Sequence, residues 1–190
     1  MLLAWANLAR AHNGAVALAY PVSGITVDGD LADWPEGLLR YPIALLEYGA
    51  APQGAGDLDA SFRLGWDAGG NALYLGLEVQ DESLIAASKD TWDNQDGCDV
   101  FLDLDHTATD VSSHQFSLWG DHRHIYNNGV HPVDFAQMES AVGRKGGRLV
   151  YEWRFDLSRR GPGGGLQGLV RSWLSICRFR TGTRMAPSRG

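Results

Sequence analysis

The sequence has few cysteines, few basic residues and no long uninterrupted hydrophobic run. Its two cysteines, Cys98 and Cys177, lack CxxC spacing, which excludes a disulfide framework or a structural zinc site. Cys98 lies in an alternating apolar register, which favours a buried inert thiol. Lys and Arg number 16 against 23 Asp and Glu, giving a net charge of -7 and an isoelectric point near 5.2. A general nucleic-acid binder needs a basic face, so neutral or cationic partners fit better.

The N-terminal stretch "MLLAWANLARAHNGAVALAY" lacks the features of an export signal. Polar residues interrupt it before a hydrophobic region of normal length forms, namely Asn7, Arg10, His12 and Asn13. We therefore read no signal peptide and no membrane insertion from this stretch. A short amphipathic helix is expected over residues 1–12, ended by Gly14, and residues 1–20 are interpreted as a connector segment.

What remains is a succession of short alternating strands within one soluble domain. The chain has 190 residues, 44% of them hydrophobic, with a mean hydropathy of -0.21. "SFRLGW" and "ALYLGLEV" alternate on either side of the turn "DAGGN" and predict a β-hairpin. Three later runs alternate in the same way: "CDVFLDLD", "HQFSLWG" and "RLVYEWRFDL". We predict an all-β, antiparallel, jelly-roll-like β-sandwich over residues 21–157.

Strand parity separates a predicted core from a predicted outer face. The uniformly apolar parity predicts that these residues are buried together between two sheets: Leu73, Leu75, Leu77, Val100, Leu102, Phe116 and Leu118. The opposite parity of "CDVFLDLD" carries Asp99, Phe101, Asp103 and Asp105, and that of "HQFSLWG" carries Gln115, Ser117 and Trp119.

If these two strands are neighbours, one outer face combines carboxylate, amide, hydroxyl and aromatic groups. Sugar C–H groups stack on an indole, and ionised carboxylates accept strong hydrogen bonds from hydroxyls. Such a face suits a neutral polyol. The alternative is an ordinary solvated sheet face whose two aromatics are covered by a loop.

Three segments, in their order and spacing, resemble the family 9 carbohydrate-binding modules and related domains: "ITVDGDLADWPEG", "FRLGWDAGGNALYLGLEVQDESL" and "TWDNQDGCDVFLDLD". The resemblance covers about residues 25–157. It implies a β-sandwich that binds sugars without catalysis, with calcium bound structurally. Relatives of this kind occur beside glycan-degrading enzymes and in membrane-bound sensors, so the resemblance also implies an extracytoplasmic or secreted domain of a larger protein.

The resemblance also implies site residues. Trp92 matches the family's sugar-stacking tryptophan, and Asp99 matches an acidic residue, usually Glu, that bonds sugar hydroxyls. Gln115 matches the first residue of a Q-F pair, after which the family has a sugar-contacting arginine where this chain has Ser117. The second tryptophan of the family's aromatic sandwich has no match in this chain. We expect ligand binding by Trp92, Asp99, Gln115, Ser117 and Trp119, with weak affinity.

The last 34 residues differ in composition from the rest. No acidic residue follows Asp156, but seven of the sixteen basic residues do. We interpret residues 158–190 as a last strand within "LVRSWLSICRF" followed by an atypical basic tail. The tail is either a frameshifted end or a basic arm that docks on an acidic surface.

Metal and haem binding are weaker alternatives. Hard oxygen ligands of the kind that calcium prefers occur at Asp28, Asp30, Asp103 and Asp105, without the D-x-D-x-D-G loop of a strong calcium signal. The residues His114, His122, His124 and Met138 could supply haem ligands in an electron-transfer domain of similar fold, although no CxxCH motif is present.

Catalytic signatures are absent from the sequence. No P-loop, dinucleotide fingerprint or Ser/His/Asp motif occurs. A glycoside hydrolase would need two carboxylates facing each other across a cleft, which acids along one strand do not supply. Trp34 is expected to plug an edge of the sandwich. The leading hypothesis is therefore a non-catalytic sugar-binding module.

Overall fold

The structure, a computed structural model of the 190-residue chain, describes residues 16–44, 54, 56–81, 97–103, 113–119, 122–127, 137–157 and 173–176. Side chains are described for all of these except 102–103, 113–119, 122–127 and 173–176. The predicted helix at residues 1–12 lies outside the described residues.

The described chain is built almost entirely of β-strands. The elements are β1 (Ala19–Pro21), the 3-10 helix η1 (Leu31–Asp33), β2 (Tyr41–Pro42), β3 (Leu58–Asp67), β4 (Ala72–Asp81), β5 (Cys98–Asp103), β6 (Ser113–Trp119), β7 (His122–Asn127), β8 (Met138–Lys145), β9 (Arg148–Asp156) and β10 (Trp173–Ile176). The helix of three residues begins after the N-cap Asp30, whose carboxylate accepts from the Ala32 N–H.

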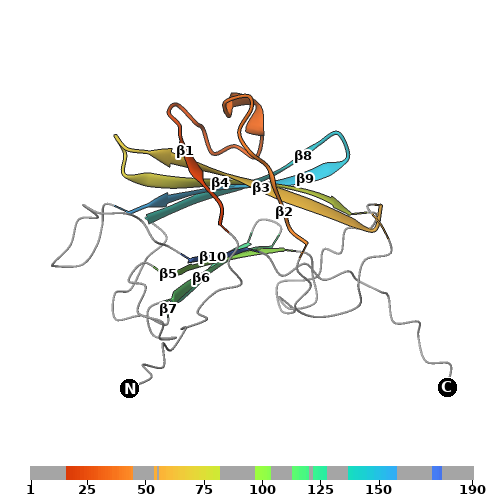
Figure 1. The fold of residues 1–190 in the computed structure, drawn as a ribbon. Helices are drawn as coiled ribbons and strands as arrows, with labels where there is room; N and C mark the ends of the chain where they lie inside the picture. Colours follow the sequence, from red (N-terminus) through yellow and green to blue (C-terminus); the bar gives the residue numbers. More distant parts are fainter. Residues whose placement is uncertain are drawn as a thin grey trace, which may run out of the picture.

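The strands form two sheets that lie one above the other (Figure 1). The large sheet has the order β1-β3-β4-β9-β8, with β2 also paired to β3, and the small sheet has the order β10-β5-β6-β7. Neighbouring strands run antiparallel except β1 and β3, which are parallel. The predicted antiparallel sandwich is confirmed.

Two tight hairpins fix the register of the large sheet. β3 and β4 are the predicted hairpin, and Asp67 starts its turn by accepting the Gly69 N–H at 2.9 Å. β8 and β9 are joined by Gly146 and Gly147, both with positive φ (59° and 83°). A two-residue turn with φ above zero at both positions matches the twist of the strands, which explains the Gly-Gly pair.

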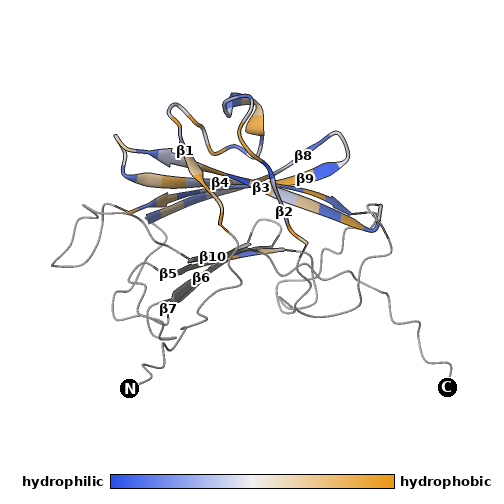
Figure 2. Cartoon of the chain, in the orientation of Figure 1, coloured by the Kyte–Doolittle hydropathy of each residue, from blue (hydrophilic) through white to orange (hydrophobic). Residues whose placement is uncertain are grey.

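The main core lies between the sheets and follows the predicted parity. It joins alternate residues of β3, β4, β8 and β9 to Cys98 and Val100 of β5. Leu75, Leu77 and Val100 are fully buried, and the orange hydrophobic positions alternate with blue ones along the large sheet in Figure 2. The core predictions for Leu73, Leu75, Leu77 and Val100 are confirmed. The side chains of Leu102, Phe116 and Leu118 are not among those described, so the burial of these three residues stays a prediction.

A second apolar cluster lies on the other side of the large sheet. The chain between β1 and β2, including η1, runs over that outer face (Figure 1). Here Val22, Ile25 and Trp34 pack with Ala72 and Tyr74 of β4. The expectation that Trp34 plugs an edge is wrong: its indole contacts Gly76 on β4, an interior strand of the sheet, because a glycine there leaves room for the ring.

Candidate functional site

The two strands that carry the predicted sugar-binding residues are neighbours in the small sheet. β5 and β6 pair antiparallel, with Asp99 opposite Ser117 and Phe101 opposite Gln115. Residues directly opposite each other in an antiparallel pair share a face of the sheet. The backbone thus brings three of the five predicted positions, Asp99, Gln115 and Ser117, into one adjacent group.

Asp99 differs in exposure from what parity suggests. It has the opposite parity to Cys98 and Val100, yet only 5% of its surface is exposed. Asp99 is therefore covered, although strand parity places it on the outer face. A carboxylate in a partly dry setting makes stronger hydrogen bonds than one in bulk water, because the local dielectric is low.

The other predicted ligand-binding residues are only partly covered by the description. Trp92 lies outside the described residues. Gln115, Ser117 and Trp119 lie on β6, where the backbone alone is described. The exposure of the Trp92 indole therefore stays a prediction.

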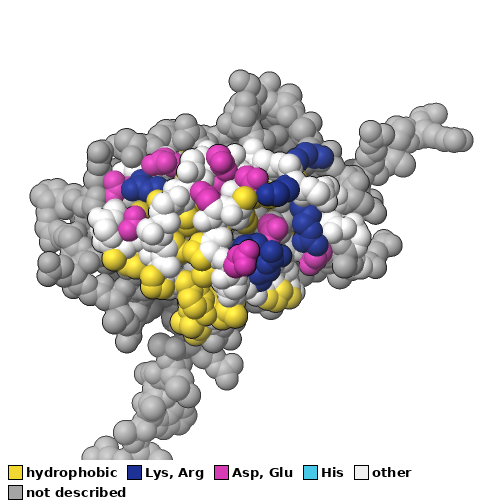
Figure 3. All heavy atoms as spheres, turned by 90° about the horizontal axis from the view of Figure 1, so that it is seen from above, with side chains coloured by type: hydrophobic (Ala, Val, Ile, Leu, Met, Phe, Trp, Pro, Cys, Tyr) yellow, Lys and Arg dark blue, Asp and Glu magenta, His cyan; other side chains and the backbone are white. Residues whose placement is uncertain are grey.

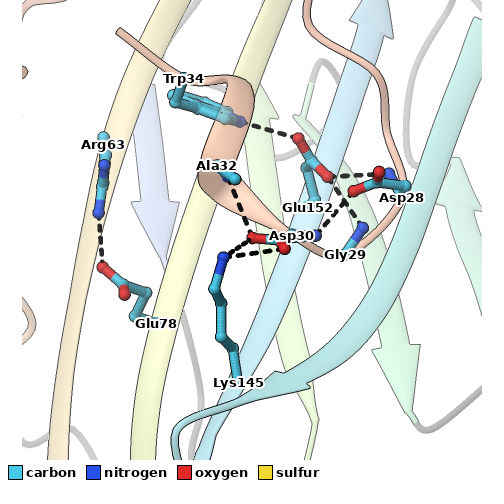
Figure 4. A network of polar contacts seen from close by, with 9 residues as sticks. All are labelled: Asp28, Gly29, Asp30, Ala32, Trp34, Arg63, Glu78, Lys145 and Glu152. Atoms are coloured by element: carbon cyan, nitrogen blue, oxygen red, sulfur yellow. Dashed lines mark hydrogen bonds and ion pairs between the residues drawn. The ribbon is translucent and has the colours of Figure 1, made fainter. Parts of the chain in front are cut away.

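A polar cluster surrounds Glu152, a residue that the alternation of the strands did not select as functional. Glu152 lies on β9, and its side chain is fully buried on the outer side of the large sheet (Figure 4). Its Oε2 atom accepts the backbone N–H groups of Asp28 and Gly29, each at 3.0 Å, and its Oε1 atom accepts the Trp34 indole N–H at 2.8 Å. Three donors thus satisfy one buried carboxylate.

Burial raises the pKa of the Glu152 carboxyl, and the donors of Trp34, Gly29 and Asp28 lower it in part. A sequence signal for this cluster did exist. Glu152 is an acid flanked by two aromatic residues, Tyr151 and Trp153, near the middle of a strand. The three N–H donors that bind Glu152 come from the D-G-x-L-x-D-W segment. Gly29 in this segment adopts φ 85°, a conformation that residues other than glycine rarely take.

The carboxylates of Asp28 and Asp30, two of the expected calcium ligands, are contacted by groups of the protein itself. Asp28 accepts the Asp30 N–H at 2.8 Å, and the ammonium of Lys145 contacts both oxygens of Asp30 at 2.6 and 2.9 Å. A cation already neutralises Asp30 and lowers the pKa of its carboxyl. Among the side chains described, no group of three or more His, Cys, Asp or Glu could hold a metal. The side chains of Asp103 and Asp105 lie outside that set, so calcium binding there stays a prediction.

Charges on the outer face of the large sheet are interspersed rather than segregated by sign (Figure 3). Ion pairs join Arg40 and Arg63 to Glu78, Lys145 to Asp30, Arg148 to Asp59, and Arg154 to Glu139. Within the described part of the chain, no helix has the length and apolar character needed to span a membrane. This face offers no basic stripe of the kind that binds phosphate backbones.

Comparison with known proteins defines the class of this chain. The family model described as "Carbohydrate family 9 binding domain-like" matches residues 27–168, well over half of the sequence. The chain belongs to this family, and it is a carbohydrate-binding module of the family 9 type. No curated protein sequence gives a significant match.

Two solved structures share the fold. Both are a carbohydrate binding module family 9 from Caldicellulosiruptor kristjanssonii, one in complex with cellotriose and the other with glucose. They are 20% and 21% identical to this chain, with a TM-score of 0.59 each, over 79% of this chain and 72% of theirs. No finding supports the haem alternative, and its candidate ligand Met138 is buried in the main core at 2% exposure.

Proposed function

We propose that this domain binds neutral glucose-type sugars, without catalysis, on the face of the small sheet formed by β5 and β6. Trp92 stacks on a sugar ring, and Asp99 and Gln115 accept and donate hydrogen bonds to its hydroxyls, with Ser117 and Trp119 beside them. The observation that carries the proposal is the pairing of Asp99 with Ser117 and of Phe101 with Gln115. Family membership supports the ligand class, as do the similar solved structures with cellotriose and glucose.

The arrangement of the buried acids supports the part of the proposal that assigns no catalysis to this domain. Among the described side chains, the buried charged residues are Asp99 and Glu152. They lie on different sheets, and Glu152 is held by three N–H donors. A glycoside hydrolase requires two carboxyl groups roughly 5 to 9.5 Å apart on either side of the scissile bond. These two acids do not supply such a pair.

The proposed setting is an extracytoplasmic protein in which this domain serves a larger chain, either an enzyme that degrades glycans or a sensor. Binding modules without catalytic machinery act by holding another domain near its substrate, which raises the effective concentration. The net charge of -7 is compatible with a neutral polysaccharide as the target. Calcium at Asp103 and Asp105 is part of this proposal.

An NMR titration with cellotriose tests the location of the site. We expect the largest shift changes at backbone amides of Asp99, Phe101, Gln115 and Ser117, and little change in β8 and β9. Asp99→Asn keeps the size of the side chain but removes the charge, and it should weaken binding. Shift changes confined to the large sheet would overturn the proposed location. A repeat with calcium and with a chelator tests the metal.

A further inference from the structure

The large sheet separates two apolar clusters that share no residue. The main core lies between the sheets. The outer cluster joins β4 to the segment Val22–Trp34, which we name the N-terminal strap. Because a sheet lies between the clusters, the contacts of the strap can be broken without opening the main core.

The strap is attached to the sheet mainly through side chains. The Val22 N–H donates to the Trp66 carbonyl at 2.9 Å at its start. Beyond that point, the polar attachments found within the described residues are the three bonds to Glu152 and the ion pair of Asp30 with Lys145. That ion pair is exposed, with 60% of the Lys145 side chain accessible, and exposed pairs contribute little. Glu152 is therefore the main polar attachment.

The strap also carries hydrogen bonds of its own. The Thr26 N–H donates to Asp33 at 2.7 Å, the Asp30 N–H to Asp28 at 2.8 Å, and the Ala32 N–H to Asp30 at 3.1 Å. These local bonds do not depend on the sheet. The strap can keep much of its shape when it leaves the sheet, which lowers the entropy cost of docking again.

Three glycines form part of the sheet surface beneath the strap, beside the side chains of Ala72, Tyr74 and Glu152. Gly65 lies under Val22, Gly76 under Leu31 and Trp34, and Gly143 against Gly29. No side chain of these three sheet positions projects into the strap. Detachment does not require interlocked side chains to separate at these points.

We propose that the N-terminal strap opens as a unit from the outer face of the large sheet while the two-sheet core stays folded, with Glu152 as the clasp that holds it. Segments with few ladder hydrogen bonds and a small apolar contact open at lower free energy than core strands. Opening uncovers Ala72, Tyr74 and Gly76 on β4. The sugar-binding face on β5 and β6 belongs to the other sheet and is unaffected.

Hydrogen exchange of the whole chain, read by NMR, tests this proposal. In the unaltered protein, we expect the amides of Asp28, Gly29 and Trp34 to exchange at least roughly tenfold faster, relative to intrinsic rates, than ladder amides of β4 and β9. Equal protection in the strap and in these strands would overturn the proposal, because it would show one cooperative unit.

Glu152→Gln tests the clasp. A glutamine has one acceptor oxygen and one NH₂ group, so at least one of the three donors loses its acceptor. We expect the strap amides to exchange a further roughly fivefold to tenfold faster, with β4 and β9 unchanged. The matched control is Glu78→Gln, on the same outer face but paired with Arg40 and Arg63, which should leave the strap unchanged.

Two results would contradict the role of Glu152. One is unchanged strap exchange in Glu152→Gln, and the other is an equal acceleration in Glu78→Gln. If Glu152→Gln does not fold, Trp34→Phe, which removes the indole N–H together with part of the ring, should accelerate exchange in the strap while β4 and β9 stay unchanged. No local effect in Trp34→Phe would then overturn the role of the clasp.

Discussion

Asp99 of β5 lies directly opposite Ser117 of β6, as cross-strand partners in the small sheet. Side chains at opposite positions are close enough to act on one ligand or on each other. Asp99 is nearly buried, while position 117 holds a serine where the resemblance to family 9 modules implies an arginine that contacts the sugar. In the proposed site, this pair thus has the acceptor that the resemblance implies and lacks the donor.

We therefore expect Ser117→Arg to increase sugar affinity. A restored contact of this kind contributes about 1 to 2 kcal/mol, or roughly fivefold to thirtyfold in Kd. Calorimetry with cellotriose measures the change. Ser61→Arg on β3 of the large sheet is the control and should leave Kd unaltered; equal gains from both substitutions would point to nonspecific attraction.

The core predicts a large cost for Leu75→Ala. Leu75 is fully buried between the sheets, and truncating a buried leucine costs about 2 to 5 kcal/mol. Urea unfolding followed by tryptophan fluorescence measures this cost. Leu39→Ala should stay within about 0.5 kcal/mol of the unaltered protein, because Leu39 is 49% exposed. Similar costs for both variants would show that the core is wrongly placed.

The contact between Gly143 and Gly29 predicts that β8 tolerates no side chain at position 143. A Cβ there would collide with the Gly29 carbonyl oxygen, and overpacking of this kind costs about 1 to 3 kcal/mol. Thermal unfolding of Gly143→Ala should show the loss. Gly56→Ala, where a Cβ meets open space, should be near neutral. An unchanged melting temperature for Gly143→Ala would count against the docking of the strap on β8.

Glu152 predicts a specific dependence of stability on pH. Burial raises the pKa of its carboxyl above the ordinary 4.5. A raised pKa in the folded state means that the stabilising contribution is fully present below about pH 4.5 and is lost as the pH rises through the folded pKa. We expect the free energy of unfolding to fall relative to that of Glu152→Gln as the pH is raised from 4.5. A difference that stays constant or grows with pH would contradict the raised pKa.

Alternation alone predicted β3, β4, β5, β6 and β9, the β3-β4 hairpin and the core positions Leu73, Leu75, Leu77 and Val100, because a period of two dictates which side chains share a face. It did not predict β1, β2, β7 and β8. It could not predict what crosses the outer face. Trp34 and Glu152 are 118 positions apart, and nothing in local pattern links them. The burial of Asp99 was likewise hidden, since parity gives the direction of a side chain but not what covers it.

The sequence predicted which residues belong to the candidate site but not which of them are neighbours in space. Spacing and resemblance selected Asp99, Gln115 and Ser117, and their adjacency depended on β5 pairing with β6, which the structure provides. The pairing of Asp30 with Lys145, distant in sequence, could not be predicted from local pattern, and calcium binding at Asp28 and Asp30 stays a prediction.

Calorimetric titration of glucose, cellobiose and cellotriose into the chain and into Trp92→Ala tests the central claim of sugar binding most directly. Trp34→Phe serves as the control, since Trp34 lies on the outer face of the other sheet. With one stacking tryptophan and no arginine, we expect a Kd no tighter than about 100 μM, near -5.5 kcal/mol. Binding should be lost in Trp92→Ala and retained in Trp34→Phe. Low-micromolar binding that survives Trp92→Ala, or no binding of any sugar by the unaltered chain, would contradict the account.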